Sequence, residues 1–479
     1  MLRQLRAAAG LTQEELAEAA GLSPRSVSDL ERGIHRTAHK DTALLLAGAL
    51  GLTESARALF VAAARGPGPS ADALAARPTA GAASATRALP RDIASFTGRQ
   101  AELTQLLNAI DALTVSGRVA GIHAIDGMAG IGKTTFAVHA AHRLARHFPD
   151  GQFFLPLHAH TPGQRPVGPA DALASLLLIA GVAAPQIPPG LEARAGRWRD
   201  QVAGKKVLLL LDDAASHEQV RPLLPGSAGS LVLVTSRRRL AALEDAAAIS
   251  LDTLSPAEGA ALLVRLAGRP GLGPAAAGVG EITRLCGYLP LAIGMLAGQL
   301  HRHPAWTAAG LAADLAAARD RLGLMQAENL SVAVAFDLSY RDLTADQQRL
   351  FRRLGLHPGP DIDAYAAAAL EDTSLDQARR HLEDLYDQHL INEPAPGRYR
   401  LHDLLREHAR ALAAADDPAG SGAAIGRLLD YYLHTALAAT VGQHFASLTA
   451  VQGHRPPGPP PAHAPDLSTP GQAAWAVCR

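Results

Sequence analysis

Apolar residues follow one pattern in the first 66 residues and another after residue 93. In residues 1–66 they recur at helical spacing between turn and capping residues, which predicts five short helices. Between residues 93 and 251 they form short continuous runs separated by helical stretches. Such runs are typical of parallel strands that helices cover on both faces. We expect these strands over 119–125, 153–157, 207–211 and 231–235.

The second half of the chain predicts further helices and one β-hairpin. Residues 253–330 are helical in pattern, and Ser255 is suited to cap their first helix. Residues 331–415 combine helices with a hairpin over 390–401, which is typical of a winged-helix domain. Residues 416–479 continue as one helix and a proline-rich tail, which we interpret as the start of a truncated sensor region.

Together these segments predict a multidomain protein, because 479 residues exceed what one compact core usually holds. An all-α helix-turn-helix domain over 1–66 precedes a flexible linker over 67–90 that is rich in Gly, Pro, Ala, Ser and Thr. An α/β P-loop NTPase domain with a parallel sheet follows over 91–252. The helical domain and the winged helix complete the expected order.

Composition excludes several classes of protein. The formal charge is zero, so no overall field draws the chain to nucleic acid, and any DNA affinity is local. Two cysteines are too few for a disulfide framework. The longest apolar run, residues 172–184, is too short to span a bilayer, and the N-terminus lacks the apolar core of a signal peptide. We therefore expect a cytoplasmic protein without a membrane partner.

The strongest motif lies between the first expected strand of the α/β region and the next helix. Residues 127–134 read Gly-Met-Ala-Gly-Ile-Gly-Lys-Thr, which is the P-loop pattern in its usual context. Small residues let successive backbone N–H groups curl around phosphates, and the helix N-terminus faces the same charge. Lys133 would neutralise the β- and γ-phosphates, and the Thr134 hydroxyl would bind Mg²⁺. The predicted nucleotide-binding residues here are Gly127, Gly130, Gly132, Lys133, Thr134 and Thr135.

Two later strands end in polar residues that parallel pairing brings to the same edge of a sheet. Asp212 follows an apolar run and is the expected partner of Thr134 in holding Mg²⁺. Asp213 either orients the attacking water as a catalytic residue or begins the next loop, and the residues alone leave both roles open. Arg237 ends a further strand, where it would contact a γ-phosphate or else belong to a solvated arginine cluster.

The ordered set of motifs resembles the NB-ARC family of signal-transduction ATPases, the STAND class, over residues 93–412. A Phe-Thr-Gly-Arg element ends at Arg99, a Gly-Tyr-Leu-Pro motif ends at Pro290, and a Leu-His-Asp motif centres on His402, with leucine replacing the family's methionine. The resemblance implies that ATP or ADP binds with Mg²⁺, that Arg99 belongs to the nucleotide site, that Pro290 packs against adenine and that His402 contacts the β-phosphate of ADP. Without it, His402 reads as a surface histidine and Pro290 as a helix-breaking turn.

Residues 1–66 resemble the Cro/repressor (XRE) type of helix-turn-helix, through Gly-Leu-Thr-Gln-Glu-Glu-Leu-Ala at 10–17 and Ser-Pro-Arg-Ser-Val-Ser at 23–28. A helical protein-binding module is the alternative. The segment holds eight Lys or Arg and seven Asp or Glu, so a single copy should bind DNA weakly and depend on assembly. The resemblance implies contacts to phosphates or base edges by Gln13, Arg25, Ser26, Ser28 and Arg32.

Both resemblances together imply a bacterial, ATP/ADP-switched transcriptional regulator. In such a protein ADP holds a closed form, ATP permits self-association, and the paired N-terminal domains bind a double-stranded DNA operator. Any ATP hydrolysis would be slow. Two alternatives stay open, namely a P-loop remodelling ATPase that needs steady turnover and a defence or antitoxin-type NTPase that only regulates its own gene. The activating signal, the operator sequence and the oligomer number do not follow from the sequence.

Overall fold

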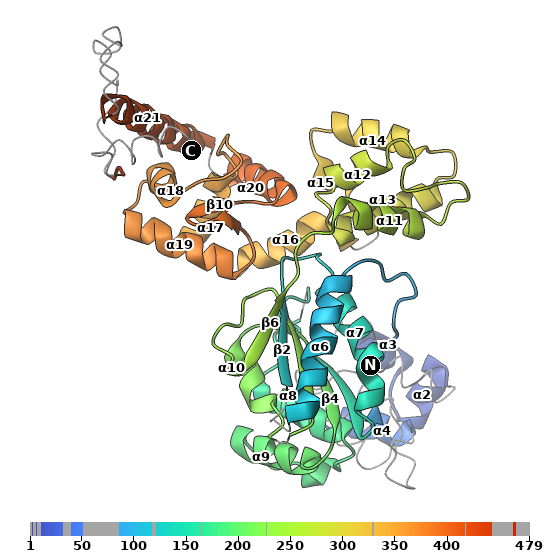
Figure 1. Cartoon of the computed structure of the whole chain (residues 1–479). Helices are drawn as coiled ribbons and strands as arrows, with labels where there is room; N and C mark the ends of the chain where they lie inside the picture. Colours follow the sequence, from blue (N-terminus) through green and yellow to red (C-terminus); the bar gives the residue numbers. More distant parts are fainter. Residues whose placement is uncertain are drawn as a thin grey trace.

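A computed structural model describes most of the 479 residues. The described residues are 2, 6, 11–31, 40–50, 86–116, 121–162, 164–226, 228–327, 330–416, 418–442 and 463–465. Figure 1 shows a sheet with helices beside it, a first group of helices labelled α11 to α15, and a last group labelled α16 to α21, in which α16 lies toward the first group. The sheet and these two groups carry the residues of the predicted nucleotide site.

The described N-terminal helices form a small unit around apolar side chains. They are α2 (Gln13–Ala19), α3 (Pro24–Glu31) and α4 (Lys40–Ala49). Thr12 caps α2 in a reciprocal pair: its hydroxyl accepts the Glu15 N–H, and the Glu15 carboxylate accepts the Thr12 N–H at 2.7 Å. Leu16 and Val27 are buried between the helices, as their spacing predicts. The helix expected over 53–64 lies outside the described residues.

Six strands form the main sheet in the order β1-β3-β4-β5-β2-β6, and every neighbouring pair is parallel. They are β1 (Thr86–Arg87), β2 (Gly121–Asp126), β3 (Gly151–Pro156), β4 (Val207–Ala214), β5 (Leu231–Ser236) and β6 (Ala246–Ser250). The four strands expected from apolar runs are confirmed. The apolar pattern misses β6, which is mostly alanine, and β1, which pairs with β3 from the end of the predicted linker.

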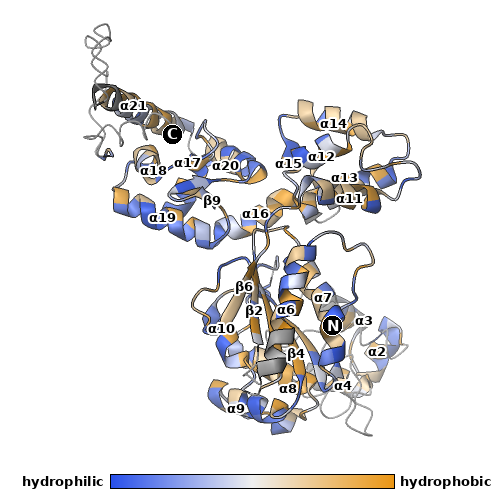
Figure 2. Cartoon of the chain, in the orientation of Figure 1, coloured by the Kyte–Doolittle hydropathy of each residue, from blue (hydrophilic) through white to orange (hydrophobic). Residues whose placement is uncertain are grey.

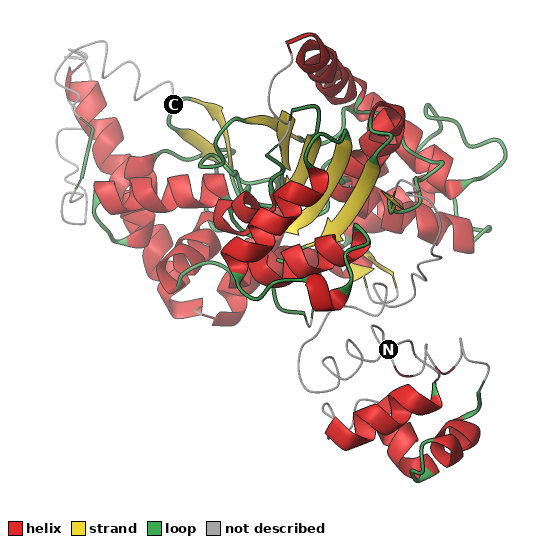
Figure 3. Ribbon diagram, turned by 90° about the horizontal axis from the view of Figure 1, so that it is seen from below, coloured by secondary structure: helices red, strands yellow, loops and turns green. Residues whose placement is uncertain are grey.

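Helices cover both faces of the sheet, as its continuous apolar strands predict (Figure 3). Side chains along β4 alternate between the two faces. Leu208 and Leu210 join the buried cluster of α6 and α7, whereas Leu209 and Leu211 join that of α8 and α9. The covering helices are α6 (Gln100–Ser116), α7 (Lys133–Leu144), α8 (Pro169–Ile179), α9 (Leu191–Val202) and α10 (His217–Val220), with 3₁₀ turns η2 (Ala145–His147), η3 (Ala184–Gln186) and η4 (Arg221–Leu223).

The helical group after the sheet begins where the sequence predicts. Ser255 caps α11 in a second reciprocal pair, with Glu258, and Pro256 is the first helical residue. A short hairpin of β7 (Gln326–Ala327) and β8 (Leu330–Ser331) leads into the last group. The helices are α11 (Pro256–Ala267), α12 (Val279–Leu285), α13 (Pro290–Arg302), α14 (Ala308–Ala317) and α15 (Arg321–Leu324).

The last group combines helices with the expected antiparallel hairpin. Its first strand extends through Ala395, so Pro396 and Gly397 form the turn of the hairpin expected over 390–401. Gly397 adopts a left-handed φ of 70° there. The elements are α16 (Val332–Arg341), α17 (Ala345–Leu354), α18 (Ala364–Glu371), α19 (Leu375–Asp387), β9 (Asn392–Ala395), β10 (Arg398–Arg400), α20 (Asp403–Asp416) and α21 (Pro418–Gly442).

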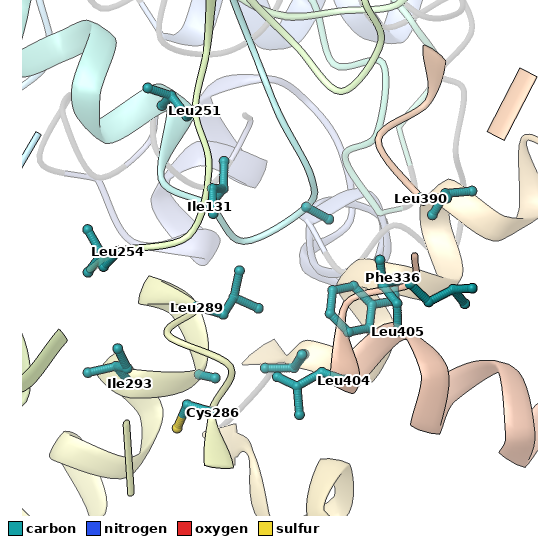
Figure 4. Close-up of a cluster of buried hydrophobic side chains, with 14 of the residues drawn as sticks. Ile131, Leu251, Leu254, Cys286, Leu289, Ile293, Phe336, Leu390, Leu404 and Leu405 are labelled. Carbon is teal, nitrogen blue, oxygen red and sulfur yellow. The ribbon is translucent and has the colours of Figure 1, made fainter. Parts of the chain in front are cut away.

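One cluster of buried side chains joins the sheet and both helical groups. Figure 4 shows Ile131 of the P-loop, Leu289 of the first group, and Phe336 and Leu405 of the last group within this cluster. In Figure 2 the strands of the sheet are among the most hydrophobic elements, consistent with their burial. Among the described helices, none is both long enough and apolar enough to cross a bilayer. The three parts therefore meet beside the P-loop.

Candidate nucleotide site

The P-loop leaves the end of β2 and enters α7 through three glycines. Gly127, Gly130 and Gly132 have φ angles of 147°, 80° and 94°, which residues with a Cβ rarely adopt. At Gly127 a Cβ would also lie 2.7 Å from the carbonyl oxygen of Leu251. The first N–H groups of α7, which starts at Lys133, have no partners within the helix. The backbone therefore has the geometry of an anion-binding loop.

The Lys133 ammonium folds back onto this loop. It donates to the carbonyl oxygens of Gly127 at 2.7 Å and Met128 at 2.9 Å. Burial of the amine and the nearby Arg237 guanidinium lower the pKa of Lys133 to about 7, although three nearby aspartates act in the opposite direction. A phosphate in the loop would add negative charge beside the amine and favour its charged form. The residues present thus fit a phosphate group.

Thr134 and Asp212 meet at the carboxyl edge of the sheet. The Thr134 hydroxyl donates to Asp212 Oδ1 at 2.7 Å, and the Thr235 hydroxyl donates to the same oxygen at 2.6 Å. Burial raises the pKa of Asp212 above its ordinary value. Thr135, the next residue of α7, is half-buried. A hydroxyl and a carboxylate oxygen in contact fit Mg²⁺, which usually keeps water and phosphate as its other ligands.

The described residues contain no group of three or more His, Cys, Asp or Glu that would hold a metal ion. A metal at this edge would therefore depend on Thr134, Asp212 and a bound phosphate together. This arrangement suits a magnesium ion that arrives with a nucleotide, and it does not suit a permanent structural metal.

Asp213 is held by a histidine that no motif includes. The His160 backbone N–H donates to Asp213 Oδ2 at 2.7 Å, and His160 Nδ1 lies 2.8 Å from Oδ1. Burial alone would raise the pKa of Asp213, yet the hydrogen bonds and charge of His160 lower it below its ordinary value. The Asp213 N–H donates to the Thr235 hydroxyl at 2.9 Å, and Asp213 has a left-handed φ of 58°. Both carboxylate oxygens that would orient a water already contact His160.

Arg237 does not belong to a solvated cluster, so that alternative is wrong. Its guanidinium is largely buried and donates to the Ala335 carbonyl oxygen at 2.7 Å and the Ser339 hydroxyl at 2.9 Å, both in α16. The neighbouring Arg239 stacks over a ring of the last group, with its Cζ 3.7 Å from the centroid of Tyr386. This edge of the sheet thus contacts the last group directly.

Arg99 is buried against the backbone of the P-loop. Its guanidinium donates to the Ile131 carbonyl oxygen at 3.4 Å and to Glu102 at 3.1 Å, and the residue is 6% exposed. Its backbone N–H donates to the Glu258 carboxylate at 2.9 Å. Arg99 therefore links the P-loop to the first turn of α11.

The motif that ends at Pro290 contacts the P-loop through its backbone. Pro290 is the first residue of α13, and the next N–H, that of Leu291, donates to the Gly130 carbonyl oxygen at 3.1 Å. A Cβ on Gly130 would lie 3.0 Å from the Leu291 side chain. The structure therefore brings Pro290 beside the loop. It is the start of a helix and not an isolated turn.

His402 joins the last group to the same motif. Its Nδ1 accepts the Leu404 N–H at 3.2 Å, so Nε2 carries the proton that it donates to the Gly287 carbonyl oxygen at 2.8 Å. Burial lowers the pKa of His402, which favours this neutral form. His402 also lines a cavity of about 20 Å³ beside Met128 and Ile131 of the P-loop. It is therefore not the surface histidine that the residues alone suggest.

The structure adds a second histidine, besides His160, that sequence reasoning misses. His389 follows α19, has a φ of 53°, and lies with its Nε2 3.0 Å from Asp126 Oδ1 at the end of β2. Asp126 also accepts a hydrogen bond from the Ser250 hydroxyl at 2.6 Å. The position of Asp126 directly before the P-loop could have marked it as a candidate, whereas no local signal marks His389.

The predicted DNA contacts are partly described. Arg25 and Ser26 are exposed, and Gln13 and Ser28 are half-exposed. The Ser26 N–H donates to the Ser23 hydroxyl at 3.1 Å, and the two hydroxyls lie 2.7 Å apart, so Ser26 also takes part in the cap of α3. Arg32 lies outside the residues whose placement is described.

Comparison with known proteins supports the N-terminal assignment. Residues 2–56 match the helix-turn-helix family, so this unit is a helix-turn-helix domain. The chain is similar to Regulatory protein AfsR of Streptomyces coelicolor, with 43% identity over 356 residues that cover 73% of this chain and 36% of that protein. Regulatory protein AfsR of Streptomyces griseus is 43% identical over 350 residues, with the same coverage of 73% and 36%. The chain spans about a third of the length of these relatives.

Among solved structures, the chain is similar to a signal transduction ATPase with numerous domains (STAND) that carries a tetratricopeptide repeat sensor, from Pyrococcus horikoshii. That likeness has 17% identity and a TM-score of 0.33, and covers 78% of this chain and 50% of that chain. The ORC2 protein of Aeropyrum pernix matches with 14% identity and a TM-score of 0.39, covering 70% of this chain and 97% of that chain. The assignment of the sheet-containing region to the α/β class rests on its own parallel sheet and P-loop.

Proposed function

We propose that the chain is an ATP/ADP-switched DNA-binding transcriptional regulator that stays closed with ADP and assembles with ATP. The observation that carries this proposal is that the first group forms a hydrogen bond with the P-loop and the last group lines a cavity together with it. Leu291 of the first group donates to Gly130, and His402 of the last group lines the same cavity as Met128. A nucleotide bound at the loop would therefore act on the positions of three parts at once.

The residues of the loop divide the proposed work of binding. Lys133 and the first N–H groups of α7 would hold the phosphates, while Thr134 and Asp212 would hold Mg²⁺, which neutralises phosphate charge when bound. Pro290 and His402 would contact the nucleotide from the two helical groups. In this proposal Arg237 contacts a γ-phosphate only after it leaves its partners in α16, and this exchange would distinguish ATP from ADP.

Slow hydrolysis fits this arrangement better than rapid turnover. In this proposal Asp213 would orient the attacking water, yet both of its carboxylate oxygens contact His160. A carboxylate in this state must exchange partners before it can act on a water. The contacts made by His402 and Arg237 between the domains also favour a protein that changes state over one that turns over continuously.

The DNA-binding part of the proposal depends on assembly. The helix-turn-helix match covers residues 2–56, and residues 1–66 carry about one net positive charge. Weak single contacts become strong when several copies are held together, because linked copies raise the effective concentration at the operator. Because a single helix-turn-helix domain should bind DNA weakly, self-association would control whether the protein binds its operator. The similarity to Regulatory protein AfsR supports a regulatory role.

The test measures mass and DNA binding in two nucleotide states. The full chain is mixed with Mg²⁺ and either ADP or a non-hydrolysable ATP analogue, and light scattering gives its mass. Anisotropy then measures its affinity for a duplex selected from random sequence. We expect larger assemblies and tighter DNA binding only with the ATP analogue. Equal mass and equal DNA affinity in both states would refute the switch.

Lys133→Ala provides the matched variant for this experiment. Loss of the ammonium should weaken nucleotide binding by about 10- to 100-fold, because one charge-assisted contact to phosphate is removed. Lys205→Ala is the control, since Lys205 is an exposed lysine after α9 that lies outside the P-loop. The control should retain the nucleotide dependence of the parent chain.

A further inference from the structure

His160 connects the candidate phosphate site to α16. The residue follows β3 and is only 7% exposed. Its backbone N–H and its Nδ1 both face the Asp213 carboxylate, at 2.7 Å and 2.8 Å. Its other ring nitrogen, Nε2, lies 3.2 Å from Oδ2 of Asp342, the C-cap residue of α16. One buried ring therefore contacts a carboxylate beside the P-loop and a carboxylate of the last group.

Two arginines of the sheet edge hold the same helix. Arg237 donates to Ala335 and Ser339 of α16, and Arg238 lies 3.9 Å from the Asp342 carboxylate. Apolar side chains of α16 pack into the last group, where the Phe336 ring lies 6.0 Å from the ring of His408. The helix is thus attached to the sheet edge by polar contacts and to its own group by apolar contacts.

These two kinds of attachment respond differently to a movement of α16. The apolar contacts move with the helix, because they belong to the same packed group. The polar contacts span two parts of the chain, so a movement of α16 breaks them and releases the His160 ring from Asp342. Nδ1 of the same ring contacts Asp213. Loss of the contact between Nε2 and Asp342 would therefore change how firmly Asp213 is oriented.

We propose that His160 is a positioning residue that couples the orientation of Asp213 to the docking of α16. This inference rests on the proposed function, since it names the contact through which the nucleotide site and the last group affect each other. With α16 docked, His160 holds Asp213 from one side and Asp342 from the other, and ADP is retained. With α16 undocked, the ring loses one anchor and ADP retention falls.

Asp342→Ala tests the α16 arm without altering the P-loop. The full chain is titrated with ADP and with a non-hydrolysable ATP analogue, and the ratio of the two dissociation constants is compared with that of the parent. We expect ADP binding to weaken about five- to tenfold relative to the analogue, the size of a typical coupling between sites. Asp337→Ala is the control, because Asp337 is also on α16 but pairs with Arg341 of the same helix at 2.6 Å.

His160→Asn separates the two arms of the bridge. The asparagine amide can replace Nδ1 as a donor to Asp213, but it is too short to reach Asp342. It should therefore shift the nucleotide ratio as Asp342→Ala does, while keeping the kcat of the slow hydrolysis. His160→Ala removes both ring contacts and leaves only the backbone N–H contact to Asp213, so it should also change kcat, with little change in KM. The double variant His160→Ala with Asp342→Ala should shift the ratio no further than His160→Ala alone.

If His160 has a purely structural role, its substitution should lower the thermal unfolding midpoint. The ratio of the two nucleotide dissociation constants should then stay unchanged, and kcat should not change separately from KM. Should His160→Ala fail to fold, Asp342→Ala carries the test, since the Asp342 side chain is 40% exposed. The coupling is overturned if the ratio of the two nucleotide dissociation constants is unchanged in both Asp342→Ala and His160→Asn while the parent chain still assembles differently with ADP and with the ATP analogue. A parent chain that does not discriminate removes the proposed function, and this coupling with it.

Discussion

The helix-turn-helix domain and the nucleotide region differ in how far along the chain their stabilising contacts reach. In the described part of the helix-turn-helix domain, the buried apolar residues run from Leu16 to Leu50. In the nucleotide region one buried cluster joins residues from Leu103 to Tyr431. The first unit is therefore held by neighbours in sequence, whereas the second is held by contacts between distant parts of the chain.

The polar contacts show the same difference. In the helix-turn-helix domain, Thr12 pairs with Glu15 within one helical turn. In the nucleotide region, His402 binds the carbonyl of Gly287, and Arg237 binds that of Ala335. Local contacts stabilise an element, while contacts between groups select one arrangement of several stable parts. A substitution can therefore open the nucleotide region without unfolding it, and the following predictions test this difference.

The largest expected effect comes from the core that α16 shares with the last group. Phe336 is 1% exposed and is shown in Figure 4 among its apolar neighbours. We expect Phe336→Ala to lower the free energy of unfolding of this region by about 3–5 kcal/mol, because truncation leaves a cavity. Urea unfolding followed by far-ultraviolet circular dichroism measures it. Leu429→Ala, at a residue that is 56% exposed, is the control, and an equal loss there would contradict the prediction.

A second truncation separates the two units. Leu16 is fully buried in the helix-turn-helix core, so Leu16→Ala should lower the free energy of unfolding of that unit by about 2–5 kcal/mol. DNA binding should be lost while ADP affinity is retained, and both are measured on one preparation. Glu18→Ala, at an exposed position of the same helix, should leave DNA binding intact. A parallel fall in ADP affinity would show that the units are coupled.

A glycine substitution tests the contact between the helical groups. Gly287 has a φ of 57°, and a Cβ there would lie 2.3 Å from His402. Gly287→Ala should destabilise the closed form by about 1–3 kcal/mol through backbone strain and displacement of the ring. Thermal unfolding and ADP affinity measure the effect. Gly397→Ala is the matched control, because Gly397 has a similar φ of 70° but no atom within 4 Å of the added Cβ.

The smallest expected effect concerns acid sensitivity. His408 is buried beside Phe336, Tyr340 and Phe351, and burial lowers its pKa. The unfolded chain then takes up a proton near the ordinary histidine pKa of about 6.5 that the folded chain does not, so stability falls as the pH drops through that value. Between pH 7.5 and 5.5, we expect the free energy of unfolding of His408→Phe to fall by about 1 kcal/mol less than that of the parent chain. Urea unfolding at both pH values checks this, and an unchanged pH dependence would contradict it.

Local patterns were sufficient to predict the elements that position the site. The P-loop glycines, the caps at Thr12 and Ser255, and four apolar strands are recognisable because each depends on residues a few positions apart. Thr134 and Asp212 were also predictable as neighbours, since parallel strands bring their carboxyl ends to one edge. The alanine-rich β6 carries no comparable signal, because its pairing with β2 is imposed by the sheet.

The partners of Arg237, His389 and His160 were not predictable in this way. Arg237 ends a strand where a phosphate contact is expected, yet in the folded chain it binds α16, about a hundred residues later. His389 and His160 occupy loops in which no spacing signals a role. Their contacts exist only because the sheet and two helical groups pack together, and such packing depends on the combined surfaces of all three. Residues a few positions apart determine single elements and their caps. Contacts between residues far apart in the chain determine how the sheet and the two helical groups are arranged around the P-loop.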